Sequence, residues 1–135
     1  MKTIFILDKD RDRQIQMNNN LSAMGFAVRC FSSAAEFEGV NNKPFLIILD
    51  ENIESLKKIH KKMPGVPIVL MVATLDAKVA ADVNKMAFEV IEKNPAEFVN
   101  LRTTIDKIVN APAKTSWFSR LFSKKQSNTL PALSV

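Results

Sequence analysis

Three charged side chains stand at or just beyond the ends of short, mainly apolar runs of the sequence. They are Asp8, Asp50 and Lys93. Proteins hold Mg²⁺ with one or two carboxylates, water and phosphate oxygens, and phosphoryl transfer needs positioning and charge neutralisation. An ammonium beside a carboxylate can equally be a plain ion pair that neutralises a cluster of acids. What these residues do therefore depends on whether the fold brings them together.

The runs before these residues belong to a set of short segments rich in aliphatic and aromatic side chains. Such segments are typical of strands buried on both faces of a parallel sheet. Five strands are predicted, over residues 3–7, 26–31, 45–49, 66–73 and 88–91.

Helices are predicted between these strands from apolar residues that recur at spacings of three and four. The first is expected to end at Gly25, where a helix commonly takes a left-handed cap. Ser32 or Ser33 can cap the second, and the helix that follows residues 66–73 is expected to reach Met86.

The last helix carries the most start signals. Asn94 is predicted as its N-cap, with Pro95 at the first helical position and Glu97 three residues after the cap. Its apolar stripe is predicted to contain Phe98, Leu101, Ile105 and Ile108.

Strands that alternate with helices predict a doubly wound α/β fold, in which helices cover both faces of a parallel sheet. In such sheets, ligands bind beyond the carboxyl ends of the strands. We expect Asp8, Asp50 and Lys93 to meet there, at the ends of three inner strands.

Over about residues 1–110 the chain resembles the receiver domain of bacterial two-component response regulators. The resemblance is carried by Asp8 after strand one, Asp50 after strand three and the run Ile91-Glu92-Lys93 after strand five. Residues 24–28, which read Met-Gly-Phe-Ala-Val and are followed by Ser33-Ala34, are similar to the second strand and its loop in such domains.

This resemblance implies a five-stranded sheet of flavodoxin-like receiver topology and a stand-alone cytoplasmic role in phosphorelay signalling. Asp50 would accept a phosphoryl group from a histidine kinase or phosphotransfer protein, and Lys93 would contact the phosphoryl oxygens. Asp8 and Asp50 would share a Mg²⁺ ion. Output would pass through contacts with a downstream protein, and the chain would be no enzyme beyond its own phosphorylation.

The sequence departs from the receiver pattern at several positions. Lys9 replaces the acid that binds the metal directly, which weakens Mg²⁺ binding, so that Asp10 and Asn52 become further metal-ligand candidates. Val72 and Val90 stand where the switch hydroxyl and the switch aromatic are expected, and the loop after Asp50 is shortened.

These departures favour an alternative: a pseudo-receiver that works as an adaptor without phosphorylation, with the Lys9 ammonium in the volume of a metal. A flavin- or nucleotide-binding protein of similar architecture is disfavoured, because the chain has only 3 glycines and no glycine-rich loop after the first strand.

The distribution of charge along the sequence limits the kinds of partner that the chain is expected to bind. The net charge of +5 comes mainly from residues 111–135, which carry four basic residues and no acid, and the rest is nearly neutral. We therefore expect no nucleic-acid-binding face, and a flexible basic-aromatic tail that contacts a membrane surface or a partner.

No apolar run is long enough for a membrane span or a signal peptide. Cys30 is interpreted as a small buried hydrophobe, and His60 as a solvated residue.

Overall fold

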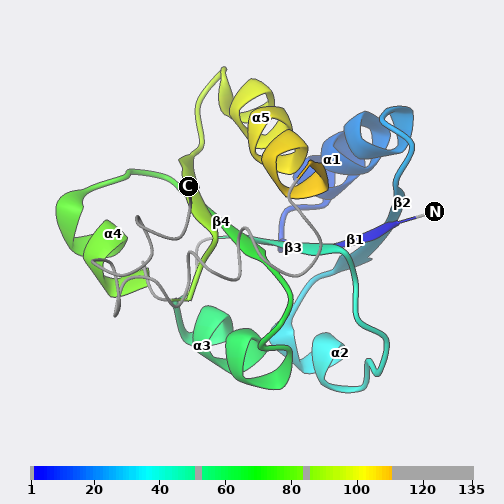
Figure 1. Ribbon diagram of the computed structural model, residues 1–135, viewed down its shortest axis with the longest axis horizontal. Coiled ribbons are helices and arrows are strands. Elements are labelled where there is room, and N and C mark those ends of the chain that lie inside the picture. Colours follow the sequence, from blue (N-terminus) through cyan, green and yellow to red (C-terminus); the bar gives the residue numbers. More distant parts are fainter. Residues whose placement is uncertain (1, 51–52, 84–85, 111–135) are drawn as a thin grey trace, which may run out of the picture. The chain divides into compact units, whose positions relative to one another are not determined.

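The structure is a computed structural model that describes residues 2–50, 53–83 and 86–110, without the side chains of residues 53, 79 and 82. Contacts divide the chain into two units, residues 1–93 and 94–135, and each is described by itself. Strands and helices alternate throughout (Figure 1). They are β1 (Thr3–Leu7), α1 (Arg11–Ala23), β2 (Ala27–Phe31), α2 (Ala34–Glu38), β3 (Leu46–Asp50), α3 (Ile53–Lys62), β4 (Ile68–Val72), α4 (Ala77–Val83), β5 (Glu89–Glu92) and α5 (Glu97–Val109).

The first unit is built on one five-stranded sheet with the order β2-β1-β3-β4-β5. All of its strand pairs are parallel, and the register places Leu7 beside Leu49 and Val72 beside Glu92. Helix α1 lies on one face of the sheet, and α2 and α3 lie on the other (Figure 1). The predicted doubly wound α/β fold is confirmed.

Side chains that alternate along the strands form two apolar layers, because successive residues of a strand point to opposite faces. One layer joins Phe5, Leu7 and Leu49 to residues of α2 and α3, such as Phe37 and Leu56. The rings of Phe5, Phe31 and Phe37 meet edge to face within this layer, with centroids 5.2 to 5.7 Å apart. The opposite residues of these strands are buried as well, and so are Met17 and Leu21 of α1.

The ends of α1 and α2 follow the local chemistry of the sequence. Asp10 caps α1, and Ser33 caps α2 by accepting a hydrogen bond from the backbone of Glu36. Gly25 follows α1 with a φ of +96°, a left-handed conformation that glycine adopts without steric cost. The predicted end of the first helix at Gly25 is confirmed.

Two predicted helix limits are wrong. Helix α4 is described as far as Val83, and beyond residues 84–85, which lie outside the described part, Met86 stands in a turn and not in a helix. Helix α5 begins at Glu97, with Ala96 in the cap position, because the Asn94 side chain accepts a hydrogen bond from Ala96 N and closes a turn before the helix. In this second unit, Leu101, Thr104, Ile105 and Ile108 form the buried side of α5.

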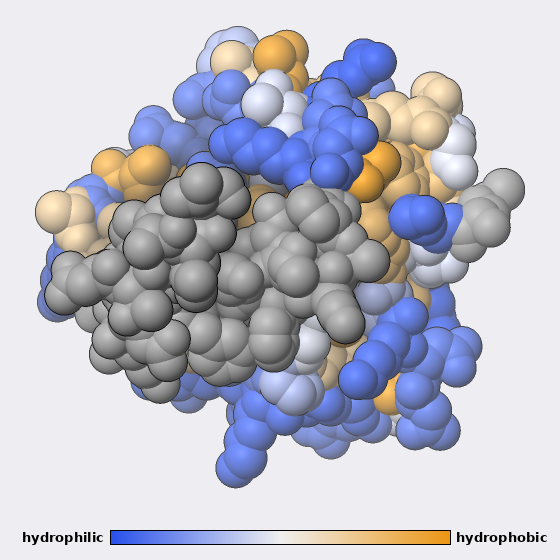
Figure 2. All heavy atoms as spheres, in the orientation of Figure 1, coloured by the Kyte–Doolittle hydropathy of each residue, from blue (hydrophilic) through white to orange (hydrophobic). Residues whose placement is uncertain are grey.

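Among the described residues visible in Figure 2, most are polar, and apolar residues show between them in small groups. The large apolar side chains that are exposed in the described residues are Ile15, Leu75, Val99 and Val109. No helix in the described part of the chain has the length and apolar character needed to cross a membrane.

Candidate functional site

The carboxyl ends of β1 and β3 open into a hollow of about 340 Å³. Asp8 and Asp50 lie at the ends of these two neighbouring strands, and both line the hollow. The remaining walls come from Leu7, Lys9, Ser32, Ser33, Ala34, Leu49 and Ser55. The structure therefore brings the two predicted acids into one site, together with Lys9.

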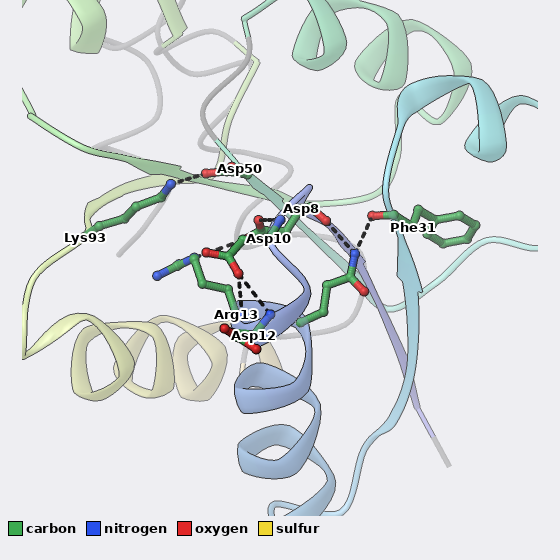
Figure 3. A network of polar contacts seen from close by, with 8 residues as sticks. Asp8, Asp10, Asp12, Arg13, Phe31, Asp50 and Lys93 are labelled. Carbon is green, nitrogen blue, oxygen red and sulfur yellow. Dashed lines mark hydrogen bonds and ion pairs between the residues drawn. The ribbon is translucent and has the colours of Figure 1, made fainter.

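Asp50 and Lys93 form an ion pair between Oδ1 and Nζ (Figure 3). Their side chains are 27% and 22% exposed, so the pair is partly shielded from water. Lys93 follows β5, which is the edge strand and not an inner one as expected, and β4 lies between β5 and β3. A hydrogen bond of 2.7 Å from Lys93 N to Val72 O holds the backbone of the lysine against β4. The lysine side chain can thus reach Asp50 past the end of β4.

Asp8 has a different cation. Its Oδ2 accepts a hydrogen bond of 3.0 Å from Nε of Arg13, and its Oδ1 accepts one of 2.9 Å from the backbone of Asp10 (Figure 3). The Asp8 side chain is only 6% exposed. A carboxylate removed from water in this way needs a charged partner, and Arg13 supplies it from the first turn of α1.

Gln14 anchors the start of α1 to the strand ends. Its Nε2 atom lies 2.5 Å from Asp8 O, 3.4 Å from Phe31 O and 3.3 Å from Ser32 Oγ. Asp8 and Ser32 directly follow β1 and β2, and Phe31 is the last residue of β2, so one buried amide joins the carboxyl ends of the two strands next to Arg13. Arg13 and Gln14 could not be identified from the sequence, because their roles depend on contacts across the fold.

Asp10 and Asn52 are the other two predicted metal ligands. Asp10 directs Oδ1 to the backbone N–H groups of Asp12 and Arg13, at 2.9 and 3.3 Å, as the N-cap of α1. Asn52 lies outside the described residues, as does the tail 111–135. Within the described part of the chain, no three acidic, histidine or cysteine side chains group closely enough to hold a metal ion.

These residues do not fit a Mg²⁺ site. Asp8 is already paired with a guanidinium, Asp10 caps a helix, and the exposed Lys9 brings a positive charge to the wall of the hollow. A positive charge beside the site repels a cation, and the repulsion doubles for a divalent one.

Both predicted switch positions hold buried or partly buried valines. Val72 is 3% exposed and belongs to the core, while Val90 is partly buried against the same core. Thr74, the next hydroxyl after β4, is exposed. Neither valine side chain offers a hydrogen bond, so the side chains at these two positions of β4 and β5 are apolar.

Comparison with solved structures shows many chains of the same fold, although neither a protein-family model nor a curated protein matches the sequence. The response regulator TrrA of Thermotoga maritima, in complex with Mg²⁺ and BeF, is 21% identical, with a TM-score of 0.70 over 80% of this chain and 99% of its own. The non-phosphorylated HemR receiver domain of Leptospira biflexa is 17% identical, with a TM-score of 0.74 over 86% of this chain and 100% of its own. Another response regulator of Thermotoga maritima is 24% identical, with a TM-score of 0.70 over 82% of this chain and 99% of its own.

The similarity extends across nearly the whole length of each of these structures. The chain therefore has the fold of response-regulator receiver domains.

Proposed function

We propose that this chain is a stand-alone receiver module of phosphorelay signalling, with Asp50 as its phosphoryl acceptor. The observation that carries the proposal is the ion pair between Asp50 and Lys93, which joins the ends of β3 and β5. A partly shielded carboxylate at the rim of a hollow, with its own ammonium, is suited to take up a phosphoryl group and to neutralise the charge that arrives with it.

In the proposed reaction an Oδ atom of Asp50 attacks the phosphorus of the donor. A bond from oxygen to phosphorus forms, and the bond to the leaving group breaks with its electron pair going to the donor. The product is an acyl phosphate, which carries more negative charge than the carboxylate, and Lys93 can remain paired with it. The donor would be a histidine kinase or phosphotransfer protein, and the signal would pass to a protein target through surface contacts.

A second candidate function is a phosphorylation-independent adaptor with the same fold. It is favoured by the contact between Asp8 and Arg13 and by the valines at positions 72 and 90. In this version the ion pairs of the site hold a single conformation, and the surface of that conformation binds a partner.

Intact-mass spectrometry distinguishes the two functions. Wild type, Asp50→Asn and Asp106→Asn are incubated with acetyl phosphate, with and without Mg²⁺. Asp106 lies exposed on α5, so its variant is a control for the loss of one acid. The first function predicts the mass of one phosphoryl group on wild type and Asp106→Asn and none on Asp50→Asn. If wild type gains no mass under either condition, the acceptor role is wrong and the adaptor remains.

A further inference from the structure

We infer that Arg13 serves as the built-in counter-cation of the strand-end site in place of a divalent metal ion, so that this site works without Mg²⁺. The inference rests on the proposed function, since it concerns the same hollow, and it assigns a positioning role to a residue outside the predicted set. It contradicts the expectation that Asp8 and Asp50 share a Mg²⁺ ion.

The first support is the state of Asp8. Both of its carboxylate oxygens have partners in the described structure: Asp10 N at 2.9 Å and Arg13 Nε at 3.0 Å. A metal ion would have to displace the guanidinium or approach it closely, and like charges repel strongly where water is largely excluded. The Asp8 side chain is 6% exposed, so the repulsion would be little screened.

The second support is the charge balance of the site. Asp8 is paired with Arg13, and Asp50 is paired with Lys93, so each carboxylate has its own cation. Lys9 adds a further positive charge to the wall of the hollow. The five side chains sum to a net charge of about +1 when all are ionised at neutral pH, whereas a Mg²⁺ site needs excess negative charge.

The third support is the rigidity of the segment that carries Arg13. Asp10 caps α1, and Gln14 bonds the helix start to the carboxyl ends of β1 and β2. Swinging Arg13 away from Asp8 would leave a buried carboxylate without its cation, while the helix start itself cannot shift without breaking the Gln14 contacts. Arg13 is therefore a fixed part of the site.

The test is Mn²⁺ titration, with Mn²⁺ as a paramagnetic stand-in for Mg²⁺, followed by line broadening of backbone amides in NMR spectra. Wild type is expected to show no selective broadening at Asp8, Asp50 and Lys93. The variant K9D/R13Q, which removes both extra cations and supplies an acid, is expected to bind Mn²⁺ at least ~10-fold more tightly at these amides. Arg11→Gln is the control for the Arg13→Gln part of this variant, because Arg11 lies exposed on the same helix and its substitution also removes one positive charge.

Selective broadening in wild type at the Mn²⁺ concentration that saturates K9D/R13Q would overturn the inference. If K9D/R13Q does not bind Mn²⁺, the inference is overturned as well, because Lys9 and Arg13 would then not be the residues that exclude the ion. K9D alone changes an exposed side chain and is expected to keep the fold. It should bind little Mn²⁺, since Arg13 still holds Asp8, and tight binding by K9D would refute the role of Arg13.

A failure of this inference can be distinguished from a failure of the acceptor role of Asp50. If acetyl phosphate modifies Asp50, the rate should be equal within about twofold with Mg²⁺ and with excess EDTA, because no metal ion assists the reaction. A ~10-fold change in the rate would correspond to about 1.4 kcal/mol of metal assistance. A strong Mg²⁺ requirement would overturn the inference and leave the acceptor role of Asp50 intact. If Asp50 is never modified, the acceptor role fails, while the Mn²⁺ titration still decides the role of Arg13.

Discussion

The Nε atom of Arg13 lies 3.0 Å from Oδ2 of Asp8, and the two residues come from the start of α1 and the end of β1. This contact gives a nearly buried carboxylate a cation from its own chain. A second cation, Lys93, reaches Asp50 from the edge of the sheet. Two acids that a metal ion would be expected to bridge thus have separate partners, and the consequences for stability and reactivity can be measured.

Arg13→Gln should destabilise the fold by about 2 kcal/mol, because it leaves Asp8 charged, shielded and without its cation. Fully buried pairs lose ~3–5 kcal/mol when one partner is removed, and the 20% exposure of the Arg13 side chain reduces that cost. Urea unfolding measures the change, with Arg11→Gln as the control. The double variant Asp8→Asn/Arg13→Gln should be more stable than Arg13→Gln alone, and no recovery would contradict the importance of the pair.

The coupling between Asp50 and Lys93 should be about 1 kcal/mol in a double-mutant cycle of Asp50→Asn and Lys93→Met. The pair is less than one third exposed, which places it above ordinary surface pairs but below buried ones. Denaturant unfolding of wild type, both single variants and the double variant gives the coupling free energy. Additive effects of the two changes would show that the ion pair does not stabilise the fold.

Gln14→Leu should destabilise the fold by about 2 kcal/mol, since it removes the amide that bonds to Asp8 O and Phe31 O and leaves these buried carbonyl oxygens without that donor. Gln16→Leu makes the same chemical change at an exposed position of the same helix and should stay within ~0.5 kcal/mol of wild type. Thermal and urea unfolding provide the comparison. Equal effects of the two substitutions would argue against the anchoring role of Gln14.

Gly25→Ala should destabilise the protein by about 1 kcal/mol, because a side chain is strained at a φ of +96°. The control is Gly39→Ala, whose φ of −83° suits any residue and whose surroundings leave room for a methyl group. Its unfolding free energy should change by less than ~0.5 kcal/mol. Equal losses at the two glycines would mean that backbone conformation is not the cause.

Cys30 should react slowly with iodoacetamide in the folded protein. Burial, and to a lesser extent the negative charge of Asp8, raises the pKa of the thiol above its ordinary value of 9.0. The rate should therefore rise at higher pH in the native protein than in the urea-unfolded one, because the thiolate is the reactive form.

The same shift has a consequence for stability. Since the folded-state pKa of Cys30 is raised, its contribution to stability is complete below the ordinary pKa and is lost as the pH rises through the folded value. Cys30→Ser should lack this loss at alkaline pH. Identical alkylation profiles for the native and unfolded chain would contradict the shift.

The strands and two of the helix limits, at Gly25 and Ser33, could be predicted because they depend on local patterns. Residues 45–49 are all apolar, as is typical of a parallel strand that is buried on both faces of the sheet. The observed strand β3, Leu46–Asp50, is shifted by one residue from this prediction. The start of α5 could not be predicted in the same way. Asn94 has a strong capping preference, but its side chain closes a turn with Ala96 instead of capping the helix, and residue type alone does not choose between these two uses.

By itself the sequence determined the parallel α/β fold and the arrival of Asp8 and Asp50 at one end of the sheet, because strand periodicity and alternation with helices leave few other arrangements. Only the tertiary structure decided which cation meets which acid. Lys93 crosses from the edge strand to Asp50, and Arg13 turns back onto Asp8. Such pairings depend on strand order and on where a helix begins relative to a strand end, and these are properties of the folded chain rather than of residue spacing.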